Sequence, residues 1–102
     1  MSERRRLPNR RRSVSFNFEC NSLRYTCTIS RFSDGALAEI FIGNAKQGSQ
    51  SDAAAKDAAV VASIALQYGV PLETIRKALL RDARGVASSP LGVALDIVAD
   101  QK

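Results

Sequence analysis

The amino-acid sequence predicts an α+β fold, in which a three-stranded antiparallel sheet is followed by two to three packed helices. Residues 14–43 alternate between apolar and polar side chains, which is the period of half-buried strands. Residues 52–99 instead place apolar side chains three or four positions apart, which is the period of helices. With 102 residues, 45% of them apolar and 25% charged, the chain is one domain at most.

The expected strands span residues 14–20, 23–31 and 36–43 and form a meander with one apolar face. The side chains expected on that face in the first two strands are Val14, Phe16, Phe18, Cys20, Leu23, Tyr25, Cys27 and Ile29. A turn at residues 21–22 would place Cys27 opposite Phe16, too far from Cys20 for a disulfide, so both cysteines are expected to be buried thiols. Gly35 suits the second turn. Glu39 lies in the third strand, whose outer face is expected to be in water.

Three helices are expected over residues 52–68, 72–80 and 90–99. The first is rich in alanine, so it can approach a sheet or another helix closely, and it implies an exposed apolar stripe that fits self-association. Gly69 is suited to follow its last turn, and Pro71 is suited to the first turn of the next helix.

The basic charge of the chain is concentrated at its N-terminus. The first twelve residues contain one acidic residue, Glu3, and six arginines: Arg4, Arg5, Arg6, Arg10, Arg11 and Arg12. The rest of the chain has equal numbers of basic and acidic residues. We therefore expect a basic arm over residues 1–13 and a neutral domain over residues 14–102. Such an arm favours a phosphate-bearing partner, nucleic acid or nucleotide, although a solvated leader has the same composition.

The residue types present exclude several functions. The chain has no histidine and two cysteines, which excludes histidine-based catalytic triads and zinc sites, and we identify no catalytic residue and no metal site. Lys46, Gly48 and Ser49 lack the pattern of a nucleotide-binding loop but could hold an anion at a helix N-terminus. A simple turn and helix cap is the alternative. No apolar run is long enough to span a membrane and no secretory signal is recognised, so we expect a cytoplasmic protein.

Residues 65–80 have the spacing of a DNA-reading helix-turn-helix, with Gly69 in the turn and Ile75 in the core. Thr74, Arg76 and Lys77 would then face the DNA groove. The same spacing arises wherever two helices pack across a tight corner, so the pattern alone leaves both interpretations open.

Four segments occur in an order and at a spacing that resemble a known family: RLPNRRR at 6–12, DGALAEIFI at 34–42, AKQGS at 45–49 and SIALQYGVPLE at 63–73. Together they resemble the C-terminal region of class II, adenosylcobalamin-dependent ribonucleotide reductases, the TSCPD domain. The residues at family-motif positions are Gly35, Glu39, Gln67, Tyr68, Gly69, Pro71 and Glu73. The resemblance implies that the corner at residues 65–80 is a helix–helix junction within the domain.

The resemblance implies an accessory role in ribonucleoside-diphosphate reduction and deoxyribonucleotide supply. This chain lacks the catalytic barrel, so we expect no activity from it alone and no cofactor in it; adenosylcobalamin is associated only with the full-length enzyme. The expected partner is a reductase subunit or a nucleotide. A small DNA-binding protein that uses the arginine arm and the 65–80 corner is the first alternative. The second is a homo-oligomer that sequesters a small nucleotide.

Overall fold

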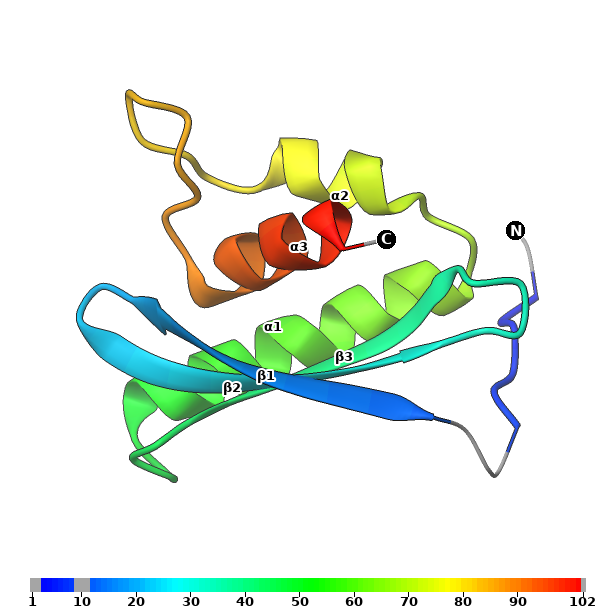
Figure 1. Cartoon of the computed structure of the whole chain (residues 1–102), viewed down its shortest axis with the longest axis horizontal. Helices are drawn as coiled ribbons and strands as arrows, with labels where there is room; N and C mark the ends of the chain where they lie inside the picture. Colours follow the sequence, from blue (N-terminus) through cyan, green and yellow to red (C-terminus); the bar gives the residue numbers. More distant parts are fainter. Residues whose placement is uncertain (1–2, 9–11, 102) are drawn as a thin grey trace.

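The computed structural model describes residues 3–8 and 12–101 and has the predicted α+β arrangement (Figure 1). Its elements, in chain order, are β1 (Ser13–Cys20), β2 (Leu23–Arg31), β3 (Leu37–Asn44), α1 (Gln50–Gln67), α2 (Leu72–Ala78) and α3 (Pro90–Asp100). The strands form one antiparallel sheet in the order β1-β2-β3. The helices follow the sheet, so the predicted fold class is confirmed.

The β1–β2 hairpin has the predicted register. Asn21 and Ser22 form its two-residue turn, with φ of 52° and 67°, as a type I′ turn requires. Cys27 is therefore paired with Phe16 across the ladder, as the position of the turn predicted. Both cysteines are buried free thiols, and Cys27 is completely inaccessible to solvent.

The core lies between the inner face of the sheet and the helices. Its largest fully buried apolar side chains are Ile40, Ile42, Leu95 and Val98. The expected inner face is wrong at one position, because Val14 is 56% exposed, whereas Phe16 is partly buried and packs against the core. Only the second half of β1 is covered, where Phe18 and Cys20 are buried.

Helix α1 lies along the free edge of β3 and hydrogen-bonds to its backbone. The Ser63 hydroxyl accepts from the Ile40 N–H and donates to the Ile40 carbonyl, both at 2.9 Å. Further along α1, Gln67 Nε2 donates to the Ala38 carbonyl at 3.0 Å. An exposed strand edge invites pairing with another chain, and here helix side chains take the place of that partner strand.

The helix side chains that meet β3 share one helical stripe. Asp52 accepts a hydrogen bond from the Asn44 N–H at 2.8 Å. Asp52 lies eleven residues before Ser63, or about three helical turns, so the two side chains are on the same side of α1. Between these polar contacts the stripe is alanine, and Ala55, Ala59 and Ala62 are almost fully buried. Small side chains let the helix axis come near the strand, so that short polar side chains reach its backbone.

Glu39 is on the outer face of β3, paired with Ser30, but it does not lie in water as expected. Only 7% of Glu39 and 4% of Ser30 is exposed, whereas Phe41, further along the same face, is 47% exposed. The expectation treated a polar position in the alternating pattern as solvated. In the folded chain the outer face is covered at Glu39 and open at Phe41.

In the part of the chain that the structure describes, no helix combines the length and the apolar character needed to cross a bilayer.

Replacing Ser63 with alanine tests the contact between α1 and the strand edge. Ser63→Ala leaves a buried N–H and a buried carbonyl of Ile40 without their partner. We expect the free energy of unfolding in urea to fall by about 2 kcal/mol, the usual cost of an unsatisfied buried group. Ser88→Ala, at an exposed position, is the matched control and should have little effect. Equal stabilities of the two variants would contradict this role of Ser63.

Candidate functional site

The described part of the basic arm, residues 3–8, contacts the C-terminal end of α1. The Arg5 backbone N–H donates to the Gln67 carbonyl at 2.6 Å, and Arg4 Nε donates to Gln67 Oε1 at 2.6 Å. Gln67 therefore joins the arm to α1 and, through its Nε2, to β3. The last carbonyls of a helix carry partial negative charge, so cationic side chains are favourable there.

The Arg5 side chain extends in the other direction, toward the β2–β3 turn. Its guanidinium is 3.0 Å from the Asp34 carboxylate and lies over the Phe32 ring, 3.9 Å from the centroid. The Ala36 N–H and then Arg5 hold the pKa of Asp34 below its usual value. Arg5 is thus engaged in the fold, although its side chain remains about half exposed.

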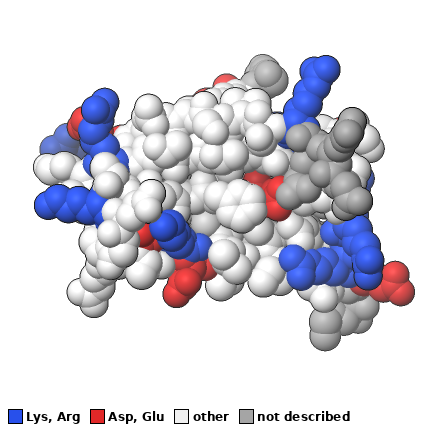
Figure 2. All heavy atoms as spheres, turned by 90° about the horizontal axis from the view of Figure 1, so that it is seen from below, with Lys and Arg blue, Asp and Glu red and all other residues white. Residues whose placement is uncertain are grey.

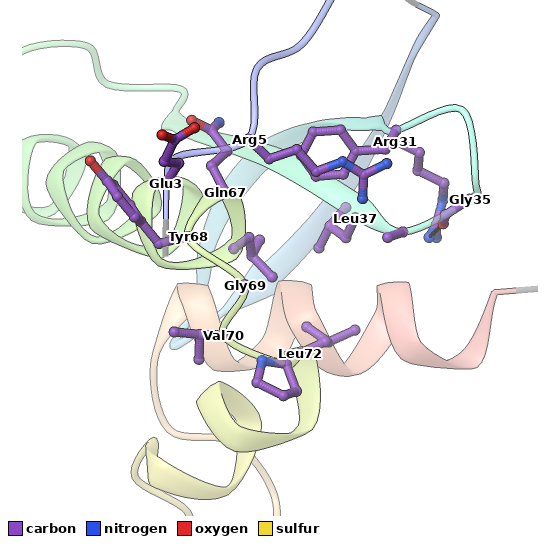
Figure 3. A pocket seen from close by; sticks show the side chains of 14 residues that line it. Glu3, Arg5, Arg31, Gly35, Leu37, Gln67, Tyr68, Gly69, Val70 and Leu72 are labelled. Atoms are coloured by element: carbon purple, nitrogen blue, oxygen red, sulfur yellow. Dashed lines mark hydrogen bonds between the residues drawn. The ribbon is translucent and has the colours of Figure 1, made fainter. Parts of the chain in front are cut away.

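A groove of about 550 Å³ lies between the arm, the β2–β3 turn and the residues that follow α1 (Figure 3). The side chains and backbone that line it include Arg5, Arg31, Gly35, Tyr68, Gly69 and Pro71. Two of the four segments that carried the sequence resemblance, residues 34–42 and 63–73, meet here. Arg31 and Phe32, at the end of β2 and just after it, were not predicted as site residues, and Asp34 was identified only as the first residue of the 34–42 segment.

Beside this groove is a more polar depression of about 900 Å³, lined by Glu3, Arg4, Arg5, Arg6, Gln67 and Tyr68. Arg4 and Arg6 are exposed at this end of the molecule, where basic side chains gather in Figure 2. Arg12, just before β1, is also exposed. The predictions for Arg10 and Arg11 fall outside the described residues.

We call the polar depression lined by Glu3, Arg4, Arg5, Arg6, Gln67 and Tyr68 the arm cleft.

The corner between α1 and α2 is a packing junction. Gly69 has a φ of +94°, a conformation that side-chain-bearing residues rarely adopt, and it lets the chain turn from one helix into the next. Leu72, Ile75 and Leu79 pack against the core. Helix α2 has only seven residues, and most recognition helices need more than that to cross a DNA groove.

Of the residues predicted to face a DNA groove, Thr74 and Lys77 are exposed, whereas Arg76 is turned toward α3. Arg76 pairs with Glu73 on its own helix and with Asp96 of α3 at 3.0 Å. Arg81 forms two hydrogen bonds with the same Asp96 carboxylate, at 2.7 and 2.8 Å. Arg81 and then Arg76 lower the pKa of Asp96 to about 2. This network ties α2 to α3, which favours the packing interpretation of residues 65–80.

The expected anion site at Lys46, Gly48 and Ser49 lies at the other end of α1, about 27 Å from the arm by helix length. Ser49 caps the helix by accepting from the Asp52 N–H at 3.2 Å, while Gly48 N–H donates to the Asp52 carboxylate at 2.9 Å. The chain's own carboxylate thus takes a donor that an anion would need. Lys46 is exposed at this end of α1.

Asp52 is the centre of that end of α1. The Asn44 N–H, then Lys56 and the Gly48 N–H, lower its pKa to about 2. Lys56 Nζ is 2.9 Å from the carboxylate, and one turn of helix separates the two residues. The backbone donors and the lysine stabilise the charged form, which accounts for a buried carboxylate at a strand edge.

Neither cysteine is placed for nucleophilic or metal chemistry. Burial raises the pKa of the Cys27 thiol to about 12 and also raises that of Cys20. Among residues 3–8 and 12–101, no group of three potential metal ligands lies close enough together to hold an ion.

A meander whose last strand is held by α1, and whose arginine arm contacts the end of that helix, defines a small α+β module. Residues 3–101 match the family model described as the TSCPD domain, and the chain belongs to this family.

Curated relatives carry the name vitamin B12-dependent ribonucleotide reductase. The chain is 38% identical over 71 residues to the protein from Agrobacterium fabrum, covering 70% of this chain and 6% of that one. It is 38% identical over 72 residues to the Rhodopirellula baltica protein, covering 71% and 7%, and 35% identical over 71 residues to that of Streptantibioticus cattleyicolor, covering 70% and 12%. The chain thus spans a small part of their length. No solved structure matches it.

The two carboxylates with lowered pKa values predict how stability depends on pH. Asp52 and Asp96 have pKa values of about 2 in the folded chain, against about 3.9 for an unfolded aspartate. Both therefore stabilise the fold above pH ~4, and that contribution is lost as the pH falls from ~4 to ~2. Urea unfolding from pH 7 to pH 2 should show this loss, and a chain with both Asp52→Asn and Asp96→Asn should show less of it. An equal acid dependence of the two chains would contradict the assignment.

Proposed function

We propose that this chain is a cytoplasmic accessory module of ribonucleotide reduction that binds a nucleotide in the arm cleft. The observation that carries the proposal is the placement of Arg4, Arg5 and Arg6 around Gln67 and Tyr68. Membership of the TSCPD family and the similarity to reductases connect such binding to ribonucleotide chemistry. We assign the chain no catalytic residue and no cofactor, since vitamin B12 enters only through the names of the relatives.

The chemistry of the arm cleft suits a phosphate group joined to a flat ring. Guanidinium groups bind phosphate oxygens through paired hydrogen bonds. Tyr68 is 39% exposed beside them and offers a ring on which a base can stack. Glu3 also lines the cleft, and its negative charge would keep the phosphates on the side of the arginines.

Within the arm, the roles of the arginines differ. Arg5 is held by Asp34 and Phe32 and positions the arm on the domain. Arg4 uses its Nε–H for Gln67, but a guanidinium has four further N–H donors. Arg6 is exposed at the cleft. We therefore propose Arg4 and Arg6 as the phosphate ligands, and Lys46, Gly48 and Ser49 are too distant to contact the same nucleotide.

Nucleotide titrations with arginine variants test this proposal. A fluorescent analogue of a ribonucleoside or deoxyribonucleoside triphosphate should bind the full chain and bind about tenfold more weakly to Arg6→Gln, since a charge-assisted hydrogen bond is lost. Arg84→Gln removes a charge that is also exposed, from the 81–87 loop, and is the matched control. Added salt should weaken the binding, because it screens exposed charges.

A triphosphate that binds Arg6→Gln, Arg4→Gln and the unaltered chain equally at low salt would contradict the role of the arm. Removing residues 1–12 should abolish this binding while the domain stays folded, as judged by circular dichroism. Lys46→Gln should leave the affinity unchanged, because Lys46 lies at the opposite end of α1.

A reductase subunit is the second candidate partner, favoured by the 38% identity to a segment of vitamin B12-dependent reductases. The tagged chain, incubated with nuclease-treated native lysate, should recover such a reductase, identified by mass spectrometry. Recovery of nucleic acid in place of the reductase, when nuclease is omitted, would instead support the DNA-binding alternative. An eluate with neither would contradict both partners.

A further inference from the structure

Helix α1 turns an apolar stripe toward solvent, on the side opposite its alanine-rich buried stripe. Val60, Val61, Ile64 and Tyr68 are between 38 and 67% exposed, and their spacing places them along one side of the helix. The domain buries alanines from this helix and leaves its larger apolar side chains outside. We call this stripe the α1 ridge. Contiguous exposed apolar surface of this kind marks interaction sites.

A groove of about 520 Å³ lies beside the α1 ridge, between α1 and α2. Its walls are mainly small or aliphatic: Ala58, Ala62, Ala65, Ile75, Ala78 and Leu79. Asp57 is the single charged residue lining it in the described part of the chain. The alanines leave room for a side chain of another helix to enter, with the axes about 8 Å apart.

We propose that this surface is an interface between two copies of the chain. The two α1 helices pack antiparallel about a twofold axis near Val61, and the ridge of each copy enters the α1–α2 groove of the other. A twofold interface requires one surface that is complementary to itself. Here the ridge and the groove lie side by side on the same face, with Val61 lining the groove as well as forming the ridge.

The distribution of charge favours this antiparallel arrangement. Arg4 and Arg5 of the arm contact Gln67 at the C-terminal end of α1. Antiparallel helices place the two arms at opposite ends of the interface, separated by about the 27 Å length of α1, well beyond a screening length of about 8 Å in physiological salt. A parallel pairing would bring both arms together. The remainder of the chain has no net charge to oppose association.

The area is sufficient for a weak dimer. Helix α1, about 10 Å wide and 27 Å long, and the shorter α2, about 10 Å long, together present on the order of 400 Å² per copy. The total of about 800 Å² is in the range of weak, transient interfaces, so we expect a dissociation constant of about 100 µM. Arg4 and Arg6 lie outside the ridge and the groove, but Tyr68 belongs to both the ridge and the arm cleft, so the dimer is tested in the absence of nucleotide.

Sedimentation equilibrium of the full chain tests the proposal. Between about 1 and 500 µM, a range that spans the expected constant, the average mass should rise from monomer toward dimer. Val61→Lys should raise the dissociation constant at least about tenfold, because the ammonium group would be buried in an apolar groove. Val86→Lys is the matched control, since Val86 is 56% exposed on the 81–87 loop. Circular dichroism of each variant confirms that it is folded.

A cross-link provides a positive readout. Val61→Cys should form a disulfide-linked dimer on mild oxidation, since the axis passes near this residue, and Val86→Cys should stay largely monomeric. The buried Cys20 and Cys27 do not compete. A chain that remains monomeric up to about 500 µM, or a dimer that Val61→Lys leaves intact, would overturn the proposal. A monomer that holds a different protein through the ridge would also overturn it.

Discussion

The position of every functional element depends on the hydrogen bonds between α1 and the backbone edge of β3. Ser63 and Gln67 hold the C-terminal half of the helix on the strand, and Asp52 holds the other end. These hydrogen bonds fix the distance between α1 and β3 and the position of the helix along the strand. Contacts between alanines alone would not determine that position. They also close one edge of the sheet against pairing with other chains. The side-chain oxygen and the backbone carbonyl of Gln67 accept hydrogen bonds from the arm. The same residue therefore holds α1 on β3 and lines the arm cleft.

Much of the sheet could be predicted because its signals are local. A two-residue turn and a strict period of two determine which residues oppose each other, and Phe16 is indeed opposite Cys27. The polar contacts of α1 could not be predicted in the same way. A serine or a glutamine in a helix is usually solvated, and only the docking of α1 on β3 reveals Ser63 as buried. The burial of Glu39 was not predicted for the same reason. The alternation of apolar and polar residues indicates a strand but carries no information on what covers its outer face.

The candidate site divides along a similar line. The motif residues Gly35, Tyr68 and Pro71, from segments far apart in the sequence, line one groove. The sequence resemblance indicated that these segments matter but not that they meet. The arginines were predicted as a tail of uniform charge. In the folded chain Arg5 is a structural anchor, because the end of α1 and Asp34 provide acceptors for it. Contacts of this kind depend on tertiary structure and leave no periodic signal.

The buried thiol of Cys27 gives this molecule an internal probe of its own opening. Its sulfur is inaccessible in the middle of β2, and its high pKa keeps it protonated at neutral pH. The thiolate is the group that attacks a thiol reagent and must be exposed to do so, so Cys27 is modified only after the sheet and α1 separate. Because Cys20 is at the end of β1, the two thiols would report on different events. Their modification rates distinguish fraying of the hairpin from loss of the whole core, without any added label.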